Sequence, residues 1–163
     1  AIETRVVHSL EEAHAHYREI LAKGLEGTVV KHPQAFWRDG DSRDQCKLKL
    51  EVDVDLKIVG FREGTEGTRT ADTFGSVIVQ TIDGLLETAV SGFKREMEQY
   101  LHENRDSVLG KIMCVRANEV SPPSDSNELH SLFHPRFVEL RDDKHEADTL
   151  EQVKAQFESA VAA

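Results

Sequence analysis

The stretch VDVDLKIVGFR, residues 52–62, alternates apolar and charged side chains along most of its length. Because successive side chains on a β-strand point to opposite faces, this pattern predicts a long strand with one apolar and one charged face. The apolar face holds Val52, Val54, Leu56 and Ile58, and the charged face holds Asp53, Asp55 and Lys57. The chain changes character at this strand, so we place a domain boundary directly before it.

The residues after this strand predict four more strands and two helices. Strands are expected over 74–82, 85–90, 110–120 and 132–141, and the Asp83-Gly84 pair is typical of a hairpin turn. An amphipathic helix over 93–101 follows the third strand of the series, and a closing helix begins after Thr149. Five strands with a helix between the third and fourth predict an OB-fold barrel over residues 52–163.

Residues 1–51 predict a different, incomplete unit. Ser9 and Glu12 form a capping-box pattern, and the helix that they open is expected to end at Gly24. Its apolar face takes in Leu10, and its two histidines, His14 and His16, are expected to be solvated. Short strands are expected over 4–8, 26–31 and 46–50. Since so small a piece buries little apolar surface, we expect the end of a larger sheet. The fold class is mainly β with helices, α+β.

Composition limits the kinds of partner. The chain has 163 residues and a formal net charge of −10, which argues against a basic footprint spread over the surface but leaves room for a local basic face. Cys46 and Cys114 follow no metal or disulfide spacing, which indicates reduced thiols and an intracellular, cytoplasmic protein. The apolar runs are too short for a membrane span, and the first residues are not those of a signal peptide.

Two lysines carry the chemistry of the first unit. On a strand, Lys47 and Lys49 project to the same side about 7 Å apart, and they repel unless an anion lies between them. A phosphate chain or a carboxylate fits that position, and solvated lysines on an exposed face are the alternative. Glu26 begins a neighbouring strand and is a candidate ligand for a divalent cation. Lys31 has the opposite parity to Glu26 and is therefore expected to face away from it.

Three segments then carry a family resemblance: LEGTVVK (25–31), CKLKLEVDVDLKIVGF (46–61) and SLFHPRFVELRDDK (131–144). In this order they resemble the fourth, fifth and sixth nucleotidyltransferase motifs of ATP-dependent DNA ligases, in particular the phage ligases of the T4 type. The resemblance extends from about Thr4 to Phe157. It identifies residues 1–51 as the C-terminal part of the adenylation domain and residues 52–163 as the OB domain, with the interdomain hinge around Glu51–Asp53.

The resemblance implies ATP and Mg²⁺ as cofactors and nicked duplex DNA as the partner. A lysine attacks the α-phosphorus of ATP, AMP passes to the 5′-phosphate of the nick, and the 3′-hydroxyl then displaces AMP. Glu26 corresponds to the metal-handling residue, Lys47 and Lys49 to the pair that contacts the α-phosphate, and Lys31 is a weaker nucleotide-binding candidate. The sixth motif, which orients pyrophosphate, corresponds to Arg136, Arg141, Asp142 and Lys144, although Arg136 is equally well explained as a structural residue.

The K-x-D-G motif that supplies the family's nucleophilic lysine does not occur in this sequence. Without that lysine no adenylate forms on this chain. We therefore expect a monomeric C-terminal fragment whose partner is the N-terminal part of a ligase. Three alternatives remain open: a fragment of an RNA-capping guanylyltransferase, a non-catalytic OB-fold module that holds nucleic acid, and a metal site at Asp53 and Asp55, of which Asp55 is also placed to pair with a lysine.

Overall fold

A computed structural model describes residues 2–163 of the chain. The chain forms two compact units. The first contains the residues up to Leu50 together with Ser159–Ala163, and the second contains Glu51–Glu158. None of the helices in the described part has the length and apolar content needed to cross a membrane.

The first helix, α1 (Leu10–Ala22), begins and ends where the sequence predicts. The Ser9 hydroxyl accepts a hydrogen bond from the Glu12 backbone N–H at 3.1 Å, and the Glu12 carboxylate accepts one from the His8 N–H at 2.8 Å. At the other end Gly24 has φ +72°, a left-handed conformation that glycine adopts without steric cost and that stops the helix. The capping-box prediction is confirmed.

Three other expectations for this unit are wrong. Residues 4–8 do not form a strand: Arg5 instead forms two hydrogen bonds with Glu19 of α1, at 3.2 and 2.9 Å. Leu10, expected on the apolar face, is exposed. His16, expected in solvent, is buried, and its Nδ1 lies 3.1 Å from the Thr28 hydroxyl, because position 16 faces the strand pair that α1 covers.

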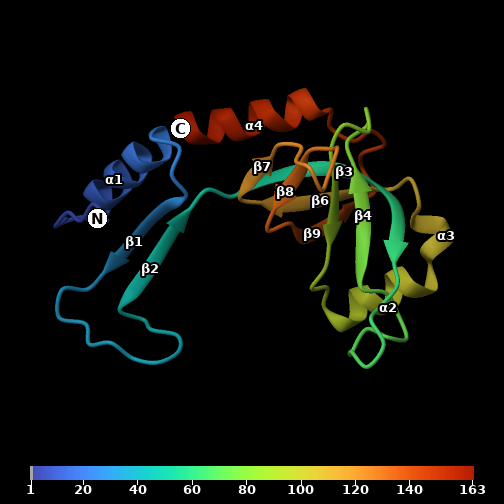
Figure 1. The fold of residues 1–163 in the computed structure, drawn as a ribbon, viewed down its shortest axis with the longest axis horizontal. Coiled ribbons are helices and arrows are strands. Elements are labelled where there is room, and N and C mark those ends of the chain that lie inside the picture. The colour runs from blue at the N-terminus through green and yellow to red at the C-terminus, as the bar shows by residue number, and fades with distance from the viewer. Residues whose placement is uncertain (1) are drawn as a thin grey trace. The chain divides into compact units, whose positions relative to one another are not determined.

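That strand pair consists of β1 (Gly27–Lys31) and β2 (Gln45–Lys49), which run antiparallel (Figure 1). Gly27 lies opposite Lys49, and the two backbones approach closely at this point. A Cβ atom on Gly27 would lie 2.1 Å from the carbonyl oxygen of Leu48, so no other residue fits there without separating the strands. The glycine of the E-G pair is therefore required by packing.

The second unit is built on one antiparallel sheet with the strand order β5-β4-β3-β6-β9, next to a small β7–β8 hairpin (Figure 1). Its elements are β3 (Val52–Arg62), β4 (Ser76–Gln80), β5 (Glu87–Val90), α2 (Arg95–Glu103), α3 (Arg105–Val108), β6 (Ile112–Ala117), β7 (Glu119–Ser121), β8 (Ser131–Phe133), β9 (Arg136–Arg141) and α4 (Leu150–Ala162). The predicted strand series and the helix after its third strand are confirmed, as is the mainly β character.

The structure differs from the prediction in three details. The strand expected over 110–120 is divided at Asn118 into β6 and β7. The strand expected over 132–141 is split into β8 and β9 at His134 and Pro135, because His134 has φ +50° and Pro135 has no N–H to give to a ladder. The sheet also does not close into a barrel. Its edge strands β5 and β9 are linked by an isolated bridge between Ser91 and Arg136 rather than by a continuous ladder.

The core of this unit lies against the apolar face of β3. Val54, Leu56 and Ile58 are almost completely buried, which confirms the alternation read from the sequence. Burial also affects Cys114 of β6, whose thiol pKa is raised to about 11 first by desolvation and then by the nearby charge of Asp53. Cys114 and the exposed Cys46 are both free cysteines.

Replacing Gly27 by alanine tests the close approach of β1 and β2. We expect Gly27→Ala to destabilise the strand pair by about 1–3 kcal/mol, because the new methyl group forces the backbones apart. Amide hydrogen exchange of β1 and β2 measures this loss. Gly60→Ala is the control, since a Cβ atom at Gly60 meets open space. Equal protection in both variants would contradict the packing argument.

Candidate phosphate-binding sites

The first group of candidate residues lies on one face of the β1–β2 pair. In an antiparallel pair, directly opposed residues share a face. The register pairs Val29 with Lys47, Gly27 with Lys49 and Lys31 with Gln45, so all three lysines lie on the same face. These lysines and Val29 are exposed. The other face carries Thr28, which contacts His16 of α1, so the lysines lie on the face turned away from that helix.

Glu26 belongs to this group. It lies just before β1, and its carboxylate is 2.5 Å from the Lys49 ammonium, with both side chains substantially exposed. The expectation that Lys31 faces away from Glu26 is wrong, because strand parity does not govern a residue outside the strand. The face thus presents three cations and one carboxylate, and Glu26 already serves as the carboxylate partner of one lysine.

The described residues do not provide a complete binding site for a divalent cation. No group of three or more His, Cys, Asp or Glu side chains is arranged there to hold a metal ion. Mg²⁺ uses six oxygen ligands and retains several waters, and Glu26 offers one carboxylate. At the alternative metal site, Asp53 pairs with Arg116 at 2.7 and 3.0 Å and Asp55 pairs with Lys144, which favours ion pairing over metal binding for both carboxylates.

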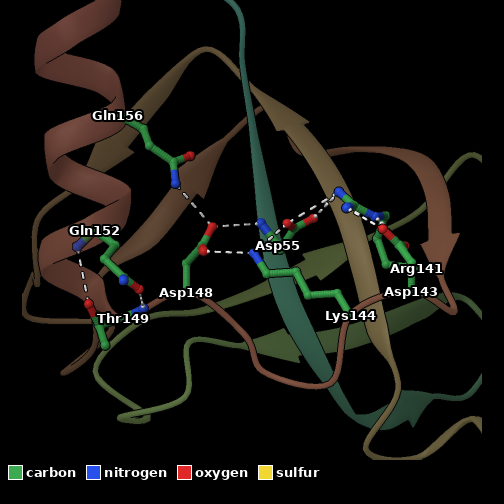
Figure 2. A network of polar contacts seen from close by, with 8 residues as sticks. All are labelled: Asp55, Arg141, Asp143, Lys144, Asp148, Thr149, Gln152 and Gln156. Atoms are coloured by element: carbon green, nitrogen blue, oxygen red, sulfur yellow. Dashed lines mark hydrogen bonds and ion pairs between the residues drawn. The ribbon is translucent and has the colours of Figure 1, made fainter.

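The second group lies at the end of β9 and in the turn that follows it (Figure 2). Arg141 forms a two-pronged contact with Asp143 at 2.9 and 2.8 Å and a longer one with Asp55 at 3.4 Å. Lys144 donates to Asp55 at 2.7 Å and to Asp148 at 3.2 Å. Arg141 and Lys144 therefore lie on either side of one carboxylate, that of Asp55 on β3.

Asp148 fixes the backbone around this pair. Its carboxylate accepts from the Asp55 N–H at 2.9 Å, and its own N–H donates to the Asp55 carbonyl at 2.8 Å. Gln156 of α4 donates to the same carboxylate at 3.2 Å (Figure 2). The hydrogen bonds from Lys144 to Asp55 and Asp148 raise the pKa of Lys144 and keep it cationic.

The two cations also line a surface hollow of about 280 Å³. Its walls are formed by Leu109, Gly110, Lys111, Arg141, Asp142, Lys144 and His145. Asp142 is 84% exposed and its carboxylate lies 3.5 Å from Lys111. Asp142 therefore pairs with Lys111. The carboxylates that contact Arg141 and Lys144 belong to other residues, Asp55, Asp143 and Asp148.

Sequence reasoning missed Asp143 and Asp148. The R-x-D-K spacing was the available signal for Asp143, because it places the acidic residue two positions after Arg141. The partnership between Asp148 and Asp55 joins residues 93 positions apart, and the sequence carried no signal for it. The interpretation that Asp55 pairs with a lysine is confirmed.

Arg136 lies apart from the hollow. Its guanidinium donates to Glu51 at 2.9 Å and to Asn118 at 3.1 Å. Both contacts join parts of the second unit next to the beginning of β3. They favour the structural interpretation of Arg136, which ties down the residue where the second unit begins.

Comparison with known proteins identifies relatives of the chain. It is 32% identical over 164 residues to the DNA ligase of Enterobacteria phage T4, a match that covers 96% of this chain and 33% of that protein. It is 31% identical over 173 residues to the DNA ligase of Methanosphaerula palustris, covering 94% of this chain and 31% of that protein. The chain thus spans about a third of the length of these relatives. No family model matches it.

Comparison of the fold with solved structures also identifies a similar protein. The solved structure Pmar-Lig_Pre superimposes with a TM-score of 0.70 at 25% identity, over 82% of this chain and 31% of that one. The fold of most of this chain therefore has a solved counterpart. The chain is similar to DNA ligases over nearly its whole length, which confirms the resemblance seen in its motifs.

The contact between Arg141 and Asp143 predicts a pH dependence. The hydrogen bond from Arg141 lowers the pKa of Asp143 from 3.8 to about 2. A carboxyl group with a lowered pKa in the folded state stabilises the fold above its unfolded pKa, and this contribution is lost as the pH falls toward 2. We expect an NMR titration of the Asp143 carboxyl carbon to show the low value and Arg141→Ala to restore the ordinary one. The lowered pKa of Asp53, which depends on Arg116, is the internal control. An unchanged Asp143 titration in the variant would contradict the pairing.

Proposed function

We propose that this chain is the part of an ATP-dependent DNA ligase that grips phosphate groups while nicks are sealed. The observation that carries the proposal is the register of β1 and β2, which gathers Lys31, Lys47 and Lys49 on one exposed face. The match to DNA ligases over nearly the whole chain supports the same function. The whole enzyme would act through an enzyme-adenylate and then a DNA-adenylate.

The chemistry of that reaction assigns a task to each group. When a lysine attacks the α-phosphorus of ATP, a P–N bond forms and the P–O bond to pyrophosphate breaks, so negative charge grows on the phosphate oxygens. Lys47 and Lys49 are point charges suited to the α-phosphate, with Lys31 further along the same face. The planar guanidinium of Arg141 and the ammonium of Lys144 are suited to the leaving pyrophosphate.

The remaining assignments are part of the same proposal. The attacking lysine belongs to an N-terminal region that supplies the K-x-D-G motif and that binds this chain within one monomeric enzyme. Nicked duplex DNA and ATP are the substrates, and both lie inside the cell, in the cytoplasm. Mg²⁺ serves the reaction with Glu26 as one ligand, but the described residues do not complete its coordination, so we assign them no metal-dependent step.

The relatives also separate the competing functions. They are named DNA ligases, which favours ligation over RNA capping. A module that only holds nucleic acid is favoured by one observation, the lack of a K-x-D-G lysine in this sequence. The two functions differ in what the exposed lysines do: a ligase uses them during the chemical steps, whereas a holding module uses them for affinity alone.

Nick sealing by the intact parent enzyme tests the proposal. We expect the double variant Lys47→Ala/Lys49→Ala to lower sealing by about a hundredfold or more, because two charge-assisted contacts to phosphate are lost. The matched control is Lys94→Ala/Arg95→Ala, which also removes two exposed cations but next to and on α2. A gel assay of a 5′-phosphorylated nick measures both. Undiminished sealing by the first variant, or an equal loss in both, would refute the proposal.

A further inference from the structure

The cations that line the hollow beside β9 have carboxylate partners that outnumber them. Its three cations, Lys111, Arg141 and Lys144, are each paired with carboxylates. Those carboxylates belong to four residues, Asp55, Asp142, Asp143 and Asp148. Of these four carboxylates only that of Asp142 lines the hollow, but together they compensate the charge of all three cations. A phosphate group that approaches therefore meets cations whose charge is already compensated.

The four carboxylates are not equivalent. Asp142 and Asp143 are 84% and 70% exposed, so water screens them and can replace them as partners. Asp148 is buried and is occupied by the Asp55 backbone and by Gln156. Asp55 has a side chain only 12% exposed, and its carboxylate is the one that contacts both Arg141 and Lys144.

The contacts with Asp55 leave other N–H donors of Arg141 and Lys144 available. A lysine ammonium has three N–H donors and an arginine guanidinium has five, so both retain donors for a ligand. The charge of Asp55 nevertheless opposes any anion that those donors could bind, and its low exposure weakens the screening of that charge by water. Asp55 therefore holds the two cationic heads side by side while it lowers their attraction for phosphate.

We propose that Asp55 sets the phosphate affinity of Arg141 and Lys144 by competing with the ligand for them. The inference rests on the proposed function, since it concerns the same two cations. A pair with uncompensated charge would retain pyrophosphate after it leaves, whereas the compensated pair releases it. Asp55 is thus an affinity-determining residue that acts through Arg141 and Lys144 rather than by touching the ligand.

Titration calorimetry with inorganic pyrophosphate tests this on the chain itself. Asp55→Asn retains an oxygen that accepts from Lys144 and removes the charge, so we expect it to bind pyrophosphate about tenfold more tightly than the wild type. Asp55→Glu retains the charge and should remain close to wild type. The matched control is Asp53→Asn, which removes the same charge two residues away on β3, where the partner is Arg116 rather than a residue of the hollow.

Each outcome decides something. Weaker or unchanged binding by Asp55→Asn, or an equal gain in Asp53→Asn, overturns the proposal. Circular dichroism checks the fold, and if Asp55→Asn does not fold, Asp55→Ser replaces it, since serine also removes the charge at this position and has an oxygen that accepts hydrogen bonds. That variant must then bind pyrophosphate more tightly than the wild type, or the proposal fails.

The double variant Arg141→Ala/Lys144→Ala separates this proposal from the proposed function. Unchanged pyrophosphate binding by the double variant would refute the phosphate site of the proposed function. A loss of binding in the double variant without a gain in Asp55→Asn would refute only the role of Asp55.

Discussion

The ion pair between Asp55 and Lys144 is the contact on which the second unit depends. Asp55 lies on β3, which is the central strand of the five-stranded sheet, and its side chain is nearly buried. A buried carboxylate is tolerated only when it is paired and hydrogen-bonded, and here Lys144 and Arg141 supply the partners. The backbone of the same residue is bonded twice to Asp148, so this one position joins β3 to the end of β9 and to the segment before α4.

This arrangement also explains how a strongly acidic chain can present cations to phosphate. The net charge of −10 does not describe the local field, because lysines and arginines gather at two places. On the β1–β2 face the lysines outnumber the single carboxylate of Glu26, which pairs with Lys49. For the cations of the hollow the balance is reversed, because their carboxylate partners outnumber them. Under the proposed function, the first group retains a phosphate and the second group releases one.

The sequence predicted the features that depend on local periodicity. The alternation in residues 52–62 and the Ser9–Glu12 cap each indicated an element that the structure contains. The predictions that were wrong concerned features that depend on contacts between residues far apart in the sequence. The burial of His16 requires Thr28 on a strand across from the helix, and the edges of the sheet meet at a single bridge, which no local pattern reveals. The break at His134 and Pro135 had a local signal in the proline itself.

For the candidate site as well, local sequence patterns predicted some features, and contacts between distant residues determined the others. Strand parity placed Lys47 and Lys49 on one face, but the position of Lys31 required the register between two strands that a loop separates in sequence. The motifs pointed to Arg141 and Lys144, whereas their carboxylate partners Asp55 and Asp148 come from other parts of the chain. A sequence motif indicates which side chains could contact a ligand, whereas the fold determines which carboxylates lie next to those side chains.

The central claim is that two separate groups of cations on this chain contact phosphate. NMR chemical-shift mapping of inorganic pyrophosphate onto the ¹⁵N-labelled chain tests it most directly. The account predicts shifts in the amides of β2 around Lys47 and Lys49 and in the signals of Arg141 and Lys144, with little change along α2. Shifts confined to other surfaces, or none at either group at concentrations where calorimetry detects binding, would contradict it.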